Sequence, residues 1–224
     1  MMGNKIAFFD FCDTIIGFQT ADRFIDFCNE AGKKKKKKKF CSQTNSRNKW
    51  LLFKIVKKVL SLCSIKKRLK LLKISGISFE ELNKFARKYY EAEIRQSFIL
   101  PVILEIKKRK EENYKIWIIS SGYDIYLKYF IEEFKLDGLI ATMLHFNKNH
   151  CFSGCIAGLD CIGVNKIKLI KRIFLDTKFD DTISYSDSKS DLPLLKWTKK
   201  GVVVSKIKSQ SWAAVNKFEE LIWA

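Results

Sequence analysis

The chain has 224 residues, of which 47% are hydrophobic, and a formal net charge of +19 at pH 7. This length and composition predict a globular protein with one large domain, or one domain that carries a modest insert. No apolar run reaches the length of a transmembrane helix, and the first apolar stretch, residues 6–9, is too short for a signal peptide. We therefore expect a cytoplasmic protein without a transmembrane segment.

In chain order, the pattern begins with a short apolar run that ends at Asp10 and predicts a buried strand. Helical spacing then dominates residues 18–97, with predicted helices at 21–30, 50–63, 65–73 and 79–94. Strands and helices alternate afterwards. The predicted strands are 5–9, 114–119, 182–185 and 201–204, a hairpin spans 146–158, and the helices that follow the insert are 99–110, 123–134, 166–174 and 192–197.

Strand–helix alternation of this kind predicts an α/β fold with a doubly wound, Rossmann-like parallel sheet. Residues 1–17 and 98–224 would form this core domain, and residues 18–97 an inserted, all-helical cap. Asp10, Ser120 and Asp187 each follow a predicted strand. Because ligands bind at the carboxyl ends of such strands, these three residues are expected to face one crevice.

The positive charge is concentrated in the predicted cap. Residues 31–78 contain many lysines and arginines and no Asp or Glu, and residues 33–39 form a lysine run that we expect to be a flexible, solvated loop. This excess indicates an anionic partner such as a phosphate, a nucleic acid or a membrane surface, or else a chain rich in lysine throughout. No specific nucleic-acid motif is present. The lysine-edged apolar pattern of residues 50–73 suits either a membrane surface or the core of the cap itself.

Seven cysteines are scattered without a repeating framework, as in a reduced protein. The densest group invites comparison with a zinc site, but it has no C-x2-C pair, so packing of small side chains around a hairpin is favoured. The members of this group are His145, His150, Cys151, Cys155 and Cys161.

Four motifs in order resemble those of the haloacid dehalogenase (HAD) superfamily. The first is Phe-Asp-Phe-Cys-Asp-Thr at residues 9–14, similar to the D-x-D-x-T motif. The second is Ile-Ile-Ser-Ser-Gly at 118–122, the third centres on Lys166, and the fourth is Ser-Asp-Ser-Lys-Ser-Asp at 186–191. The insert and the sequence around Lys166 most resemble the phosphoserine phosphatase-like subclass (HAD-IB), including proteins found in bacterial capsule and polysaccharide loci.

The resemblance implies a Mg²⁺-dependent phosphatase or phosphotransferase that works through an aspartyl-phosphate intermediate. Asp10 would be the nucleophile, and Ser120, Ser121, Gly122 and Lys166 would bind the phosphoryl group. The metal ligands would be Asp10, the backbone carbonyl of Cys12, and Asp187, with Asp191 holding a metal-bound water or orienting Lys166.

The chain departs from the family pattern at Cys12. The family has an Asp there, which protonates the leaving group and then activates water, and a thiol suits that role poorly. Either the neighbouring Asp13 takes the role, or the substrate has a better leaving group, or the protein is slow or inactive. We favour Asp13.

Gln19 occupies the position where phosphoserine phosphatases hold the substrate ammonium with an acidic residue. An amide lacks that charge, which argues against phosphoserine. The basic cap indicates instead a more anionic substrate, such as a sugar phosphate or a lipid-linked phosphate. The alternative is a catalytically weak HAD scaffold whose basic cap binds an anionic partner.

Overall fold

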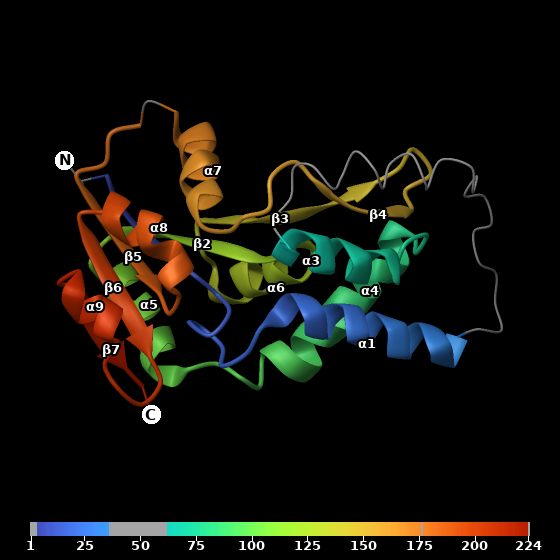
Figure 1. Cartoon of the computed structure of the whole chain (residues 1–224), viewed down its shortest axis with the longest axis horizontal. Helices are drawn as coiled ribbons and strands as arrows, with labels where there is room; N and C mark the ends of the chain where they lie inside the picture. The colour runs from blue at the N-terminus through green and yellow to red at the C-terminus, as the bar shows by residue number, and fades with distance from the viewer. Residues whose placement is uncertain (1–3, 36–61, 176, 224) are drawn as a thin grey trace.

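The computed structural model describes residues 4–35, 62–175 and 177–223 (Figure 1). Its elements in chain order are β1 (Lys5–Phe9), α1 (Thr20–Lys35), α3 (Leu62–Leu72), α4 (Phe79–Tyr89), the π-helical turn η2 (Tyr90–Ile94), α5 (Leu100–Glu111), β2 (Tyr114–Tyr123), α6 (Asp124–Phe134), β3 (Gly138–Phe146), β4 (Phe152–Ala157), α7 (Val164–Phe174), β5 (Asp181–Ser186), the 3-10 turn η3 (Lys189–Asp191), α8 (Leu192–Trp197), β6 (Lys200–Ser205), α9 (Ser211–Val215) and β7 (Glu219–Ile222).

A seven-stranded sheet organises the described residues, with strand order β4-β3-β2-β1-β5-β6-β7. Neighbouring strands are parallel except for β3 and β4, which form an antiparallel hairpin at one edge. The doubly wound α/β prediction is therefore confirmed. The strand order reverses at β1, which pairs with β2 on one side and β5 on the other. Such a reversal opens a ligand crevice at the carboxyl ends of the strands, where Asp10 follows β1.

Alternate side chains of β1 pack into two different apolar clusters. Ala7 and Phe9 belong to the larger cluster, which includes residues of α5 and α6. Ile6 and Phe8 belong to the second, with side chains from α7 and α8. The period-two alternation of a strand explains this division. It places helices on both faces of the sheet and leaves the strand ends free to carry polar groups.

The helices between β1 and α5 lie together beside one end of the sheet (Figure 1). Helix α1 contacts α3 and α4, α4 contacts α6, and α3 contacts the edge strand β4. Their apolar side chains Phe24, Leu71 and Leu82 join the same cluster as Phe130 of α6. One apolar cluster thus contains side chains from the helices between β1 and α5 and from α6, which covers the sheet. The division of the chain at residues 18 and 97 stays a prediction.

Several elements of the structure were not predicted from the sequence. Strand β3, helix α9 and edge strand β7 were not predicted, and β2 continues past Ile119 to Tyr123. Strand β3 has mixed burial and β7 is only partly buried, so neither has the continuous apolar run that marked β1. Helix α1 runs on to Lys35, into the segment predicted as a loop. Residues 36–39 of the lysine run and residues 50–61 of the predicted helix lie outside the described residues.

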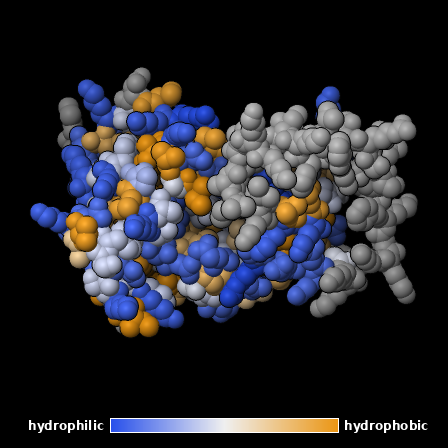
Figure 2. All heavy atoms as spheres, viewed as in Figure 1, coloured by the Kyte–Doolittle hydropathy of each residue, from blue (hydrophilic) through white to orange (hydrophobic). Residues whose placement is uncertain are grey.

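The surface of the described residues is mainly hydrophilic on the face in Figure 2. Exposed apolar side chains near and on α7 include Ile162, Val164 and Ile173. Within the described ranges, no helix is both long enough and apolar enough to cross a membrane.

Candidate active site

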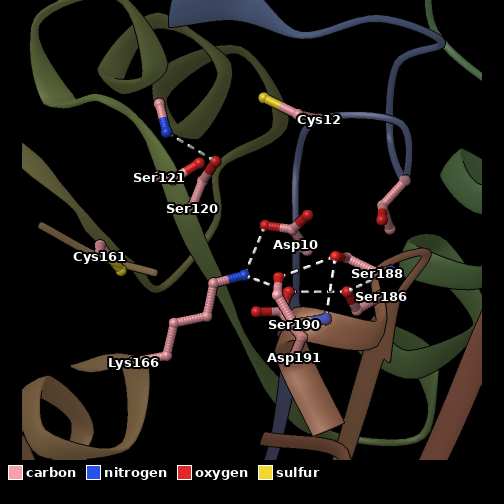
Figure 3. Close-up of polar contacts among 12 residues, drawn as sticks. Asp10, Cys12, Ser120, Ser121, Cys161, Lys166, Ser186, Ser188, Ser190 and Asp191 are labelled. Carbon is pink, nitrogen blue, oxygen red and sulfur yellow. Dashed lines mark hydrogen bonds and ion pairs between the residues drawn. The ribbon is translucent and has the colours of Figure 1, made fainter. Parts of the chain in front are cut away.

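Lys166 lies between two buried carboxylates at the carboxyl edge of the sheet. Its Nζ donates to Asp10 Oδ1 at 2.7 Å and to Asp191 Oδ2 at 2.5 Å (Figure 3). Asp10, Lys166 and Asp191 are exposed by only 6%, 2% and 2%. They come from the end of β1, the first turn of α7 and the end of η3, so residues far apart in the sequence meet at one point.

Asp191 precedes α8 but does not cap that helix with its side chain. Its Oδ2 instead accepts from Lys166 and from Ser186 Oγ, the latter at 2.7 Å. Its Oδ1 is buried and has no hydrogen-bond partner. A buried carboxylate oxygen without a donor is costly, so this atom is available to accept from a bound group.

Ser120 lies on β2 where that strand leads into α6. Its side chain is fully buried, and its Oγ accepts from the backbone N–H of Gly122 at 3.1 Å. The residues from Ser120 to Tyr123 lead directly to the N-terminus of α6, whose positive dipole end favours anions. The Ser121 carbonyl accepts from Lys67 of α3 at 2.9 Å, and Lys67 also pairs with Asp160 at 2.7 Å.

Asp187 follows β5 and is tied to the loop after β1. Thr14 Oγ1 donates to Asp187 Oδ1 at 3.0 Å and accepts from the Asp187 backbone N–H at 3.0 Å. These two bonds hold the loops of the first and fourth motifs together. They place the Asp187 carboxylate beside the loop that carries Asp10, Cys12 and Asp13.

Asp13 adopts a left-handed backbone conformation with φ of 53°, which Asp tolerates better than most residues. Its side chain is partly exposed, and Oδ2 accepts from Gln19 Nε2 at 2.6 Å. Asp13 and Gln19, the two residues to which the sequence analysis assigned unusual roles, are therefore partners of one another.

Cys12 is buried and lies on the far side of Asp10 from Lys166 (Figure 3). Its Sγ is 3.1 Å from Thr20 Oγ1, at the start of α1. Burial, with a further contribution from Asp10, raises the pKa of the Cys12 thiol to about 11, so this group stays neutral at neutral pH.

Burial also controls the charges of the other groups. It raises the pKa of Asp10 to about 7 against the opposing effect of Lys166, and the nearby Asp191 adds to the increase. Burial likewise raises the pKa of Asp187 to about 6, while its bond from Thr14 opposes the increase. For Lys166, burial disfavours the charged form, but Asp10 and Asp191 outweigh it and raise the pKa. Lys166 is therefore a firm positive charge beside Asp10, where it favours the ionised carboxylate against the effect of burial.

The structure brings together Asp10, Lys166 and Asp191 directly, and links Asp187 to the same loop through Thr14. Gln19 and Asp13 form a separate pair nearer the surface. Sequence reasoning did not foresee Lys67, Thr20 or Tyr126 near the motif loops, because no spacing signal connects them to a motif. Thr14 and Ser186 lie inside the recognised motifs, but their partners were not predicted.

No group of three or more His, Cys, Asp or Glu side chains in the described residues is arranged to hold a metal ion, so a metal at this site would need backbone or water ligands in addition to carboxylates. The cysteines considered for zinc lie in different surroundings, since Cys155 is exposed and Cys161 is buried in the cluster under α7. His145 instead contacts Ser153 Oγ at 2.9 Å.

Solved structures of known proteins share the fold of this chain. Among the solved structures, a protein of unknown function from Bordetella pertussis Tohama I superposes with a TM-score of 0.76 at 16% identity, covering 98% of this chain and 99% of that one. A substrate-bound phosphoserine phosphatase gives 0.56 at 17%, covering 91% and 87%. A phospho-aspartyl intermediate analogue of phosphoserine phosphatase gives 0.59 at 18%, covering 99% and 94%. At these identities, the similarities concern the fold.

No curated protein matches the chain. The family model of haloacid dehalogenase-like hydrolases, however, matches residues 7–196, which include all four motifs and the carboxylates around Lys166. The chain belongs to the haloacid dehalogenase-like hydrolase family.

Proposed function

We propose that this chain is a phosphatase that hydrolyses phosphate monoesters through an aspartyl-phosphate on Asp10. The observation that carries the proposal is the buried Lys166 ammonium, 2.7 Å from Asp10 and 2.5 Å from Asp191. A nucleophilic carboxylate must be ionised and fixed in direction, and a charged lysine in contact with one of its oxygens does both. The phospho-aspartyl analogue of a phosphoserine phosphatase with the same fold supports this chemistry.

The residues present fit a divalent cation. Asp10, Asp187 and Asp191 carry up to three negative charges, and Lys166 supplies one positive charge. Asp191 Oδ1 has no hydrogen-bond donor. All are hard oxygen ligands, which suit Mg²⁺ with several retained waters. Asp10, Asp187 and the Cys12 carbonyl would hold it. Asp191 would hold a metal-bound water or orient Lys166. When bound, Mg²⁺ would neutralise charge on the phosphoryl oxygens.

The chain's own residues account for two steps. Asp10 attacks phosphorus, forming an acyl-phosphate bond while the bond to the alcohol oxygen breaks. Ser120 and the nearby loop N–H groups would bind the phosphoryl oxygens, and Lys166 would balance their charge. Water then attacks phosphorus and gives its proton to the group that protonated the alcohol, while the bond between phosphorus and Asp10 breaks, releasing phosphate and restoring the Asp10 carboxylate.

The alcohol must take up a proton as it leaves. The Cys12 thiol, with a pKa raised to about 11, is a poor donor, and its sulfur lies 3.1 Å from Thr20 Oγ1. Asp13 is partly exposed, and its Oδ2 accepts a hydrogen bond from Gln19 Nε2 at 2.6 Å. We propose that Asp13 supplies this proton from the adjacent position.

Asp13→Asn should therefore slow hydrolysis of alkyl phosphates by roughly 10²–10⁴-fold, the usual worth of a positioned proton donor. An aryl phosphate needs little protonation, so its hydrolysis should slow much less. Steady-state rates on both substrates measure this difference. Cys12→Ala is the control and should change little, since only its carbonyl is used. Equal, unchanged rates for Asp13→Asn on both substrates would reject the role.

For the substrate, we propose an anionic metabolite other than phosphoserine, such as a sugar phosphate or a lipid-linked phosphate. Gln19 has no charge with which to hold an ammonium, and it is occupied by Asp13. Membership of the phosphoserine phosphatase-like subclass, and a role in capsule or polysaccharide synthesis, are parts of the same proposal.

A screen of phosphorylated metabolites for phosphate release, with Mg²⁺ or with chelator, tests the function. Release should require Mg²⁺, and Asp187→Asn should raise the Mg²⁺ concentration needed for half-maximal activity. Asp180→Asn, a change outside the site in the loop before β5, should leave that concentration unchanged. Full activity in excess chelator would contradict the metal-assisted mechanism.

A further inference from the structure

A buried chain of hydrogen bonds joins the loop of the first motif to the turn of the second. Tyr126 OH accepts from the Tyr123 backbone N–H at 2.9 Å and lies 2.7 Å from Thr20 Oγ1. Thr20 Oγ1 in turn lies 3.1 Å from Cys12 Sγ. The side chains of Cys12, Thr20 and Tyr126 are all buried. Cys12 and Thr20 are 8 positions apart, whereas Tyr126 lies 106 positions beyond Thr20.

The number of available hydrogens fixes the direction of this chain. Tyr126 OH already accepts from a backbone N–H, so its own hydrogen needs an acceptor. If Thr20 donated to Tyr126, the phenol hydrogen would be left unpaired in a buried site, which is costly. The arrangement that pairs every hydroxyl therefore runs from Tyr126 to Thr20 and from Thr20 to the Cys12 sulfur. Position 12 receives a hydrogen bond there.

The same hydroxyls lie against the phosphate-binding turn. A Cβ atom on Gly122 would come within 2.9 Å of Tyr126 OH and 3.0 Å of Thr20 Oγ1. Gly122 also donates to Ser120 Oγ, and Tyr123 is the next residue. Losing the Tyr126 hydroxyl would remove the partner of a buried N–H one residue from Gly122, so the turn that carries Ser120 would lose its anchor.

Thr20 also connects the site to the inserted helices. It is the first residue of α1, and its carbonyl accepts from Tyr89 OH of α4 at 3.0 Å. Thr20 therefore contacts the first-motif loop through Cys12, the second-motif turn through Tyr126, and α4 through Tyr89.

We propose that Thr20 and Tyr126 are positioning residues, which hold the Ser120–Tyr123 turn in the arrangement that phosphoryl binding requires. The inference rests on the proposed phosphatase function. Neither residue needs to touch the substrate, since each acts through Cys12, Gly122 or Tyr123. The Thr20 hydroxyl that donates to the Cys12 sulfur could equally donate to a carboxylate oxygen at position 12.

Tyr126→Phe and its matched control Tyr129→Phe test the inference. Tyr129 is on the same helix, but its hydroxyl bonds to Asn83 Oδ1 at 2.9 Å, away from the turn. Binding of inorganic phosphate, measured by calorimetry with Mg²⁺, should weaken about tenfold in Tyr126→Phe, since a buried hydrogen bond near the anion is lost. It should change less than about twofold in Tyr129→Phe, as expected for a remote site.

A second pair separates positioning from general stability. Thr20→Ser keeps the hydroxyl and should bind phosphate like the wild type, whereas Thr20→Val should weaken binding like Tyr126→Phe. Thermal unfolding shows that each variant is folded. Equal phosphate affinity in Thr20→Val and Thr20→Ser, or in Tyr126→Phe and Tyr129→Phe, would overturn the inference. Failure of the proposed function is distinct, because it would appear as a wild type that binds phosphate but releases none from any ester.

Discussion

Asp10→Asn should abolish phosphate release, with a loss of roughly 10⁴-fold or more in kcat, the scale on which removal of a catalytic nucleophile acts. Asparagine has nearly the same shape as aspartate but cannot attack phosphorus as an anion. It also removes one of the two carboxylates that Lys166 contacts, while the contact with Asp191 remains. We therefore expect the fold to persist, and circular dichroism with thermal unfolding measures that alongside the rate.

A matched control lies at the other end of the neighbouring strand. Asp181 begins β5 and pairs in register with Lys5, the first residue of β1, whereas Asp10 follows the last residue of β1. Asp181→Asn should keep most of the activity. An Asp10→Asn enzyme with more than a few per cent of wild-type kcat would exclude Asp10 as the nucleophile.

Lys166→Met should lower the free energy of unfolding by about 3–5 kcal/mol in metal-free protein near pH 8, since it leaves buried carboxylates without their partner. It should also remove detectable turnover. Burial already raises the pKa of Asp10, and loss of the ammonium would raise it further. The uncharged acid is then favoured in the folded state, so stability is retained at low pH and lost as pH rises. The destabilisation should accordingly be smaller at pH 5 than at pH 8.

Lys168→Met is the control on the same helix, because Lys168 is exposed and has no ion pair among the described residues. A surface change of this kind should alter stability by no more than about 0.5 kcal/mol. Chemical denaturation of both variants at the two pH values makes the comparison. Equal stability of Lys166→Met and wild type at pH 8 would show that the buried cluster is not held by this lysine.

The sequence was most informative where physical constraints are local. Strand β1 has a continuous apolar run because it is buried on both faces, and its bounds agree with the prediction. The strands that were missed, β3 and β7, are partly exposed, so their sequences carry no such run. The residues at strand ends were predictable because parallel strands bring their carboxyl ends to one edge of the sheet.

The partners of the site residues were less predictable. Asp191 stands at an N-cap position by sequence, yet its side chain serves Lys166 and Ser186 instead of the helix. The Cys12–Thr20–Tyr126 chain joins residues up to 114 positions apart, counted from Cys12 to Tyr126, and depends on how α1 and α6 pack. Such contacts follow from tertiary packing, which no local pattern encodes.

Trapping the intermediate tests the central claim most directly. The enzyme is mixed with a substrate labelled in its phosphoryl group, quenched in acid, and digested, and the labelled peptide is identified by mass spectrometry. We expect the label on Asp10, lost on treatment with hydroxylamine as an acyl phosphate should be, and absent in Asp10→Asn. Turnover by the wild type without label on Asp10, or with label on Asp13 instead, would contradict the account.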